Sequence, residues 1–131
     1  MFNISEATAI AIHAMIYIAN RKGKVCGLKE ISSYFDVSSN HLSKVLQQLV
    51  KHKYLISIKG PKGGFMLCDG KEQASLMDIY EVIEGKFIPK NCLFASNHMK
   101  QCCCIMKPLI STVNDTFVEF MTGNKINELK L

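Results

Sequence analysis

Residues 28–68 contain the feature that most limits how this chain can fold, because they combine two short amphipathic helices with a glycine-rich hairpin. The apolar spacing predicts the first helix over residues 28–35. Ser38 or Ser39 can cap the second helix, which is expected to run to about His52. Two helices joined by a short turn and followed by a hairpin are the parts of a winged helix-turn-helix.

The second helix has one apolar face and one polar face. Leucine and valine recur at positions 42, 45, 46 and 49, which is the spacing of a helix side that packs on a core. The opposite side and the first turn carry polar side chains that can hydrogen-bond to base edges and phosphates. We predict that these residues contact DNA: Ser39, Asn40, His41, Ser43, Lys44 and Gln47.

The hairpin is predicted from two short strand segments, residues 55–59 and 65–68, that flank a glycine-rich tip. Glycine lets the backbone turn tightly and come close to a phosphate, and lysine supplies positive charge. The tip residues that we expect to contact DNA are Lys59, Lys62, Gly63 and Gly64.

The positive charge of the chain lies in its first half. Residues 1–68 carry nine Lys or Arg and three Asp or Glu, a balance of +6, whereas residues 69–131 carry seven and eight, a balance of −1. A cationic surface attracts the DNA backbone because binding releases counterions. The distribution therefore favours DNA binding by the half that contains the two helices and the hairpin.

Three further helices are predicted outside that segment. Residues 5–20 should form a helix that is apolar on most sides and therefore deeply packed or shared between subunits. Its polar strip consists of Glu6, His13, Tyr17 and Asn20. A short helix follows at residues 75–84, capped by Ser75. The last helix, from about residue 107 to 122, has more apolar surface than one small domain can cover, so we expect it to pair with a second copy.

Together these elements predict a mainly α fold with a small β-hairpin wing (α+β): a winged helix-turn-helix plus a long C-terminal dimerisation helix. We expect a DNA-binding domain at residues 1–84, a cysteine-rich sensor loop at 85–106, and a dimerisation helix and tail at 107–131. No apolar run approaches the roughly 20 residues of a membrane-spanning helix. No signal-peptide pattern is seen either, so a cytoplasmic protein without membrane association is expected.

The chain has six cysteines, and three of them are consecutive. Adjacent cysteines suit a disulfide framework poorly, and clustered cysteines in a reducing compartment more often serve metal, cluster or redox chemistry. Cys26 and Cys68 lie apart from the others and are expected to be small buried core residues. The remaining four flank the predicted sensor loop: Cys92, Cys102, Cys103 and Cys104.

Residues 28–31, 41–49 and 58–67 closely resemble the Rrf2 family of bacterial winged-helix transcriptional regulators, which includes IscR, NsrR and CymR. The last of these segments matches the family's wing and is the most specific, and residues 11–19 match the pattern of its opening helix. The resemblance implies a homodimer with two winged heads and crossed C-terminal helices. It also implies sequence-specific binding to a roughly palindromic DNA operator, usually as a repressor.

The resemblance implies a sensor as well, because many members hold an iron–sulfur cluster with three cysteines of this loop. Their middle cysteine usually lies about midway between the outer two. This chain departs from that pattern, since the midpoint between Cys92 and Cys104 is His98. Imidazole can also bind iron. Two ligand sets stay open: Cys92, His98 and Cys104, or Cys92, Cys102 and Cys104, with Cys103 as an alternate.

The fourth cluster ligand in this family often comes from the first helix of the partner subunit. His13 matches the position of a histidine ligand in that helix. The cluster type, 2Fe–2S or 4Fe–4S, stays open. The resemblance therefore implies a regulator that responds to redox state, nitric oxide or iron–sulfur status through a cysteine-ligated cluster.

Three other interpretations compete with the cluster. A cluster-free family member would respond to thiol oxidation or to a partner protein, and a structural zinc site would use the same thiols. A thiol oxidoreductase would need a low-pKa cysteine, often at a helix start, as residues 102–104 could provide. No substrate-pocket motif, Ser/His/Asp set or phosphate loop accompanies those cysteines. We therefore expect neither an enzyme nor a small-molecule substrate.

Overall fold

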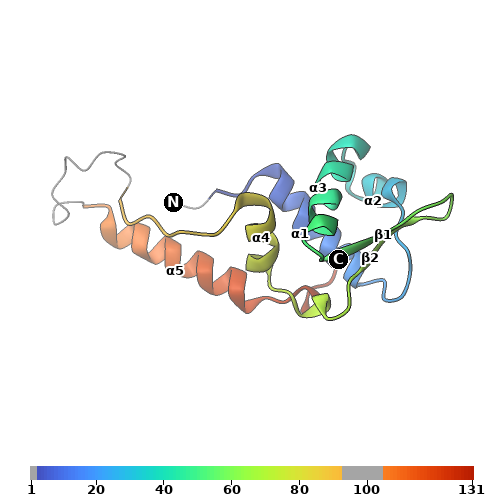
Figure 1. Cartoon of the computed structure of the whole chain (residues 1–131). Coiled ribbons are helices and arrows are strands. Elements are labelled where there is room, and N and C mark those ends of the chain that lie inside the picture. Colours follow the sequence, from blue (N-terminus) through green and yellow to red (C-terminus); the bar gives the residue numbers. More distant parts are fainter. Residues whose placement is uncertain (1–2, 93–104) are drawn as a thin grey trace.

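Helices dominate the computed structural model, which describes residues 3–92 and 105–131, and one antiparallel hairpin accompanies them (Figure 1). In chain order the elements are α1 (Glu6–Ala19), α2 (Leu28–Phe35), α3 (Ser39–Lys51), β1 (Leu55–Ile58), β2 (Gly64–Leu67), the 3-10 helix η1 (Lys71–Gln73), α4 (Leu76–Glu84), α5 (Lys107–Gly123) and the 3-10 helix η2 (Ile126–Glu128). The predicted mainly α fold with a β-hairpin wing is confirmed.

α1 lies at the centre of the core, where it packs against α3, α4, β2 and η2. A helix that is apolar on most sides is stable only when other elements surround it. Ile31, Leu46 and Ile79 bring α2, α3 and α4 into the same core, each fully buried. The predicted polar strip is wrong at Tyr17, which is only 4% exposed, because the Arg21 guanidinium lies 3.4 Å from its ring centroid and covers it.

α2 and α3 form the helix-turn-helix, and local hydrogen bonds fix the turn between them. Asp36 ends α2 in the left-handed conformation, with φ 53°, which Asp tolerates better than most residues. The Val37 N–H then donates to the Ser32 carbonyl at 3.0 Å. Ser38 caps α3, because its hydroxyl accepts a hydrogen bond from the His41 N–H. Of the two predicted caps, Ser38 is therefore the one used.

β1 and β2 pair in antiparallel register along their whole length, and this hairpin, residues 55–67, is called the wing below. The chain before α2 adds to it at one point. The Cys26 N–H donates to the Phe65 carbonyl at 3.0 Å, and the Phe65 N–H donates to the Cys26 carbonyl at 2.8 Å. Cys26 is buried as predicted, but the core prediction is wrong for Cys68, which is half-buried where the chain leaves β2.

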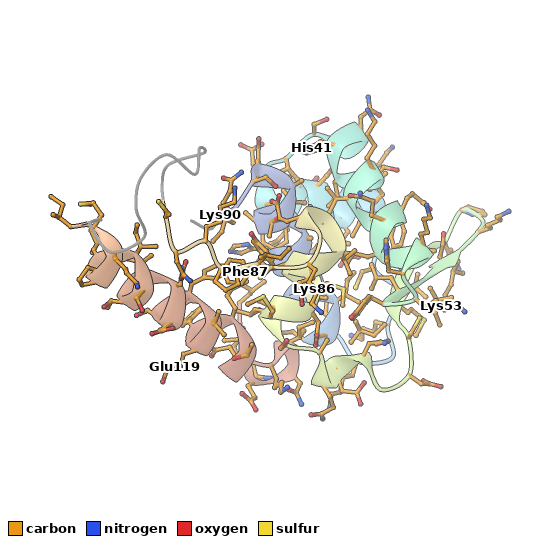
Figure 2. The ribbon with its side chains drawn as sticks, turned by 60° about the vertical axis from the view of Figure 1, so that its left-hand side comes forward. His41, Lys53, Lys86, Phe87, Lys90 and Glu119 are labelled. Carbon is orange, nitrogen blue, oxygen red and sulfur yellow. The ribbon has the colours of Figure 1, made fainter. Side chains whose placement is uncertain are left out.

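The segment after α4, residues 85–92, lies against α5 (Figure 2). The Phe87 ring packs beside those of Tyr80 and Phe117, with centroids 6.1 and 4.9 Å away. Asn114 of α5, only 4% exposed, donates from its amide to the Lys90 carbonyl at 3.0 Å. These contacts hold the chain on α5 until two residues before Cys92.

α5 begins far from the wing and runs back toward the rest of the molecule, and the chain then reaches α1 through η2 (Figure 1). Ile126 of η2 is fully buried, and the Asn20 amide donates to the Leu129 carbonyl at 3.0 Å. The sequence pattern did not predict this return. No helix in the described ranges is long and apolar enough to cross a bilayer.

Candidate nucleic-acid interface

The polar side of α3 is open to solvent, while the apolar side of the same helix is buried. A helix that reads DNA needs this arrangement, because only an accessible polar side can reach base edges in the major groove. Figure 2 shows His41 near the start of the helix and Lys53 just beyond its end. The predicted contact residues of this side are all at least partly exposed: Asn40, His41, Ser43, Lys44 and Gln47.

Ser39 differs from the other predicted contact residues of α3. Its hydroxyl lies 3.1 Å from the Ser32 hydroxyl, so it hydrogen-bonds to α2 and helps to join the two helices. As the first residue of α3, it still offers a backbone N–H that has no partner within the helix. Such groups at a helix start bind phosphate oxygens well. Its contact with DNA stays a prediction.

The glycines at the wing tip have a structural reason of their own. A Cβ atom at Gly63 would collide with the carbonyl oxygens of Ile58 and Gly60, and one at Gly64 would collide with that of Cys26. Both positions therefore need glycine for the wing to fold and to pair with the chain before α2. Their contact with DNA stays a prediction.

Three lysines give this surface a positive charge. Lys44 of α3 and Lys59 and Lys62 of the wing are exposed. Within residues 3–92 and 105–131, the ion pair found joins Arg21 to Glu30, so the three lysines are unpaired there. They can therefore approach phosphates without first breaking an ion pair.

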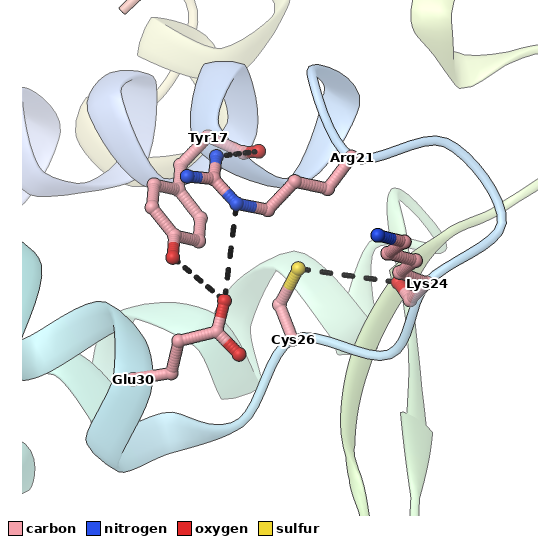
Figure 3. Close-up of polar contacts among 5 residues, drawn as sticks. All are labelled: Tyr17, Arg21, Lys24, Cys26 and Glu30. Atoms are coloured by element: carbon pink, nitrogen blue, oxygen red, sulfur yellow. Dashed lines mark hydrogen bonds and ion pairs between the residues drawn. The ribbon is translucent and has the colours of Figure 1, made fainter.

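A partly buried polar cluster joins α1 and the loop after it to α2 (Figure 3). The Tyr17 hydroxyl donates to the Glu30 carboxylate at 2.6 Å, and Arg21 Nε lies 3.9 Å from the same oxygen. Burial, together with the hydrogen bond to Glu30, raises the pKa of Tyr17 to about 12, so the hydroxyl stays protonated. Sequence reasoning missed this cluster, although the i, i+4 spacing of Tyr17 and Arg21 could have indicated it.

His13, the predicted fourth cluster ligand, is exposed on α1. Its ring Nδ1 lies 2.7 Å from the Ala9 carbonyl, which can only accept, so Nδ1 carries a proton and the lone pair of the neutral ring is on Nε2. This is the orientation that metal-binding histidines usually have. Beside His13, an apolar hollow of about 220 Å³ is lined mainly by Ile10, Phe35 and Val37.

The described residues contain only part of the predicted ligand set. Cys92 is exposed, and its thiol and the His13 imidazole are both donors that fit iron. In the part of the chain that the structure describes, no three His, Cys, Asp or Glu side chains lie close enough together to hold a metal ion. The other predicted ligands lie outside the described residues: His98, Cys102, Cys103 and Cys104.

A comparison with protein families assigns nearly the whole chain to one family. The sequence profile of the Rrf2 family, described as an iron-dependent transcriptional regulator, matches residues 4–130. The chain belongs to the Rrf2 family. This Rrf2 protein is therefore a transcriptional regulator and not an enzyme.

Individual relatives agree with that assignment. The HTH-type transcriptional regulator NsrR of Oceanobacillus iheyensis is 24% identical over 90% of this chain and 80% of its own. The structure of CymR, the global cysteine regulator of B. subtilis, has a TM-score of 0.77 at 22% identity and matches 96% of this chain and 94% of its own. T. potens IscR has a TM-score of 0.73 at 21% identity, over 95% and 83%. At these identities the two structures show a shared fold.

Proposed function

We propose that this Rrf2 protein is a homodimeric, cytoplasmic repressor that binds a roughly palindromic DNA operator in a sequence-specific way. The observation that carries the proposal is α3, whose buried apolar side fixes it on the core and whose polar side is exposed beside unpaired lysines.

In this proposal α3 enters the major groove and the wing follows the adjacent backbone. Asn40, Ser43 and Gln47 supply hydrogen-bonding groups for base edges, while Lys44 supplies charge for a base edge or a phosphate.

The remaining predicted contacts are with phosphates. Lys59 and Lys62 at the wing tip contact phosphates. His41, and the Ser39 backbone N–H at the start of the helix, lie where a phosphate can reach them.

Dimerisation is assigned to α5 because this helix leaves large apolar side chains uncovered. Ile105 just before the helix is 91% exposed, and Leu109 and Phe120 on the helix are 56% and 59% exposed. Apolar side chains gathered on one element indicate a protein interface. The proposed division of the chain therefore has a DNA-binding head at 1–84, a sensor loop at 85–106, and a dimer helix with its tail at 107–131.

Selection of DNA from a random library, followed by footprinting, tests the DNA-binding proposal. We expect the full-length protein to enrich a two-fold symmetric site whose half-sites are about one helical turn apart. Affinity for that site should exceed affinity for random DNA by roughly 10³-fold or more. Enrichment of no motif, or of an asymmetric single half-site bound by a monomer, would contradict it.

For the sensor, we propose that Cys92, Cys102, Cys104 and His13 of the partner subunit bind an iron–sulfur cluster, with Cys103 and His98 as alternates. A bound cluster supplies a centre that reacts with oxidants and nitric oxide. The chain's own part is mechanical: Phe87 and Asn114 fasten the segment before Cys92 to α5, so a displacement of Cys92 is passed to the proposed dimer helix. A shift of the two heads would then change operator affinity by roughly 5- to 150-fold.

Anaerobic purification tests the cluster directly. We expect visible absorption, with iron and acid-labile sulfide present in equal amounts, in the wild type and in the control variant Cys68→Ser. Cys92→Ser should lose both signals while staying folded. An iron-free, colourless wild-type protein would overturn the cluster proposal and leave the DNA-binding proposal intact.

The departure from the usual cysteine spacing favours one alternative, a cluster-free regulator that senses thiol oxidation or a partner protein. Cys92 is exposed and its thiol is free, so it can react without unfolding of the protein. In this case the colourless protein should change its operator affinity on treatment with peroxide and recover with dithiothreitol. Cys92→Ser should abolish that response.

A further inference from the structure

A cavity of about 260 Å³ lies between the end of α1, the loop at residues 21–24, and the chain that leads from β2 to η1. It is on the head of the molecule and contains no residue of the proposed sensor. Its volume is slightly below the roughly 300–1,000 Å³ of most small-molecule sites, so it suits a ligand no larger than one amino acid. Side chains of both charges and apolar side chains line it: Lys22, Lys24, Asp69, Glu72, Ile18 and Met66.

The charged side chains of this cavity are not paired with one another. Lys22 and Lys24 come from one segment, and Asp69 and Glu72 come from another. None of the four makes an ion pair in the described ranges, where the pair found is Arg21 with Glu30. Two cations and two carboxylates around one hollow, left unpaired by the protein itself, are complementary to a ligand that carries both charges.

We propose that this cavity binds a free α-amino acid as an effector. Its carboxylate would face Lys22 and Lys24, and its ammonium group would face Asp69 and Glu72. Apolar lining residues such as Met66 would accept the aliphatic part of the ligand. Arg21 also borders the cavity, but its guanidinium covers Tyr17 and approaches Glu30, so it is a wall rather than a ligand contact.

The two walls of the cavity lead to the two parts of the proposed DNA-binding surface. One wall continues through Cys26 into α2, and the other is the end of β2 in the wing. The paired backbone hydrogen bonds between Cys26 and Phe65 join these walls next to the cavity. A ligand that bridges the walls therefore stabilises one position of the wing relative to the helix-turn-helix. This consequence rests on the proposed DNA-binding function, whereas the binding of an amino acid does not.

Binding is measured first without DNA, by thermal unfolding and calorimetry of the full-length protein with each of the twenty common L-amino acids. We expect at least one to raise the unfolding midpoint by about 4 °C or more when it is present in large excess over its Kd. The N-acetyl derivative and the amide of that amino acid each lack one charge. Each should bind at least about tenfold more weakly, the effect of one lost charged contact.

Two double variants locate the site. Lys22→Ala with Lys24→Ala, and Asp69→Asn with Glu72→Gln, should each weaken binding by about tenfold or more. Lys86→Ala, an exposed lysine outside the cavity, should leave binding unchanged. The proposal is overturned if no amino acid binds, if the single-charge analogues bind equally well, or if the double variants keep full affinity.

The DNA arm separates this proposal from the proposed function. With the amino acid bound, operator affinity should change by roughly 5- to 150-fold in the wild type and should not change in the double variants. Amino-acid binding to a protein that selects no DNA would leave the site standing and reject the DNA-binding function. Operator binding without amino-acid binding would reject the proposed amino-acid site and support the DNA-binding function.

Discussion

The head, residues 3–84 together with η2, and the helix α5 differ in how completely one copy of the chain covers their apolar side chains. In the head, α1 is enclosed by α3, α4, β2 and η2, and the apolar side of α3 is fully covered. In the second half, α5 buries Ile110, Phe117 and Met121 but leaves Leu109 and Phe120 in solvent. The core around α1 is therefore closed within one copy of the chain, with Ile126 of η2 and Phe117 and Met121 of α5 contributing to it, whereas α5 also has apolar surface that one copy does not cover. Hydrophobic burial stabilises the fold in the first region and provides for association in the second.

Shortening one leucine to alanine in each region should give the largest difference between the head and α5. Leu46→Ala in the head should lower the free energy of unfolding by about 2–5 kcal/mol, because it leaves a cavity in a fully buried site. Leu109→Ala on α5 should instead weaken the dimer and lower the unfolding midpoint by an amount that depends on protein concentration. Chemical denaturation at several concentrations measures both effects. Equal effects of the two variants would remove the distinction between the regions.

The wing tip gives the next largest effect. Gly64→Ala should destabilise the head by about 1–3 kcal/mol, since the added Cβ meets the Cys26 carbonyl oxygen and forces the wing away from the chain before α2. Gly123→Ala at the end of α5 is the matched control, because nothing lies within 4 Å of its added Cβ. Thermal unfolding measures the difference, and a neutral Gly64→Ala would show that the pairing with Cys26 is not needed for stability.

Charge on the head should affect DNA binding without affecting folding. Lys44→Ala and Lys62→Ala should each weaken operator binding by about 5- to 20-fold, and the loss of the phosphate contact at Lys62 should lower the salt dependence as well. Lys86→Ala, just after α4, serves as the control. Fluorescence anisotropy at several salt concentrations measures these effects. If both head variants keep wild-type affinity, the assignment of α3 and the wing to DNA is wrong.

The smallest effect concerns Glu84, which connects the end of α4 to the start of α1. Its carboxylate accepts from the Ser5 N–H at 3.0 Å and from the Thr8 hydroxyl at 2.5 Å. The Ser5 side chain, then the Thr8 hydroxyl and the Ser5 N–H, hold the pKa of Glu84 below its ordinary value of 4.5. The stabilisation is therefore fully present above pH 4.5 and is lost as the pH falls through the lowered pKa. Glu84→Gln should lower stability by about 1 kcal/mol at pH 7 and flatten this acid dependence.

Unfolding curves of wild type and Glu84→Gln between pH 3 and pH 7 provide the measurement. The two proteins should converge in stability at the acid end of this range. Glu81→Gln is a useful comparison. The Glu81 carboxylate accepts from the Phe87 N–H at 2.8 Å, so it holds the segment at residues 85–92 and, within the described residues, makes no such contact with α1. A constant difference between wild type and Glu84→Gln at every pH would contradict the assigned cause.

Most of the local structure was predictable because it follows from short-range patterns. The apolar positions 42, 45, 46 and 49 determine that residues 39–51 form a helix and which side is buried. Ser38 and Ser75 mark helix starts, and the cluster of glycines marks the wing tip. Each of these signals lies within a few residues of the element that it specifies.

The sequence by itself therefore determined the elements, the winged helix-turn-helix and the polar side of α3. Only the tertiary structure decided that Tyr17 is buried under Arg21, that Ser39 bonds to α2, and that Gly64 must be glycine because Cys26 approaches it. It also brought Lys24 and Asp69 to one cavity. The physical reason is that periodicity records which side of an element is apolar, whereas the partner of each polar group depends on packing between segments far apart in the chain.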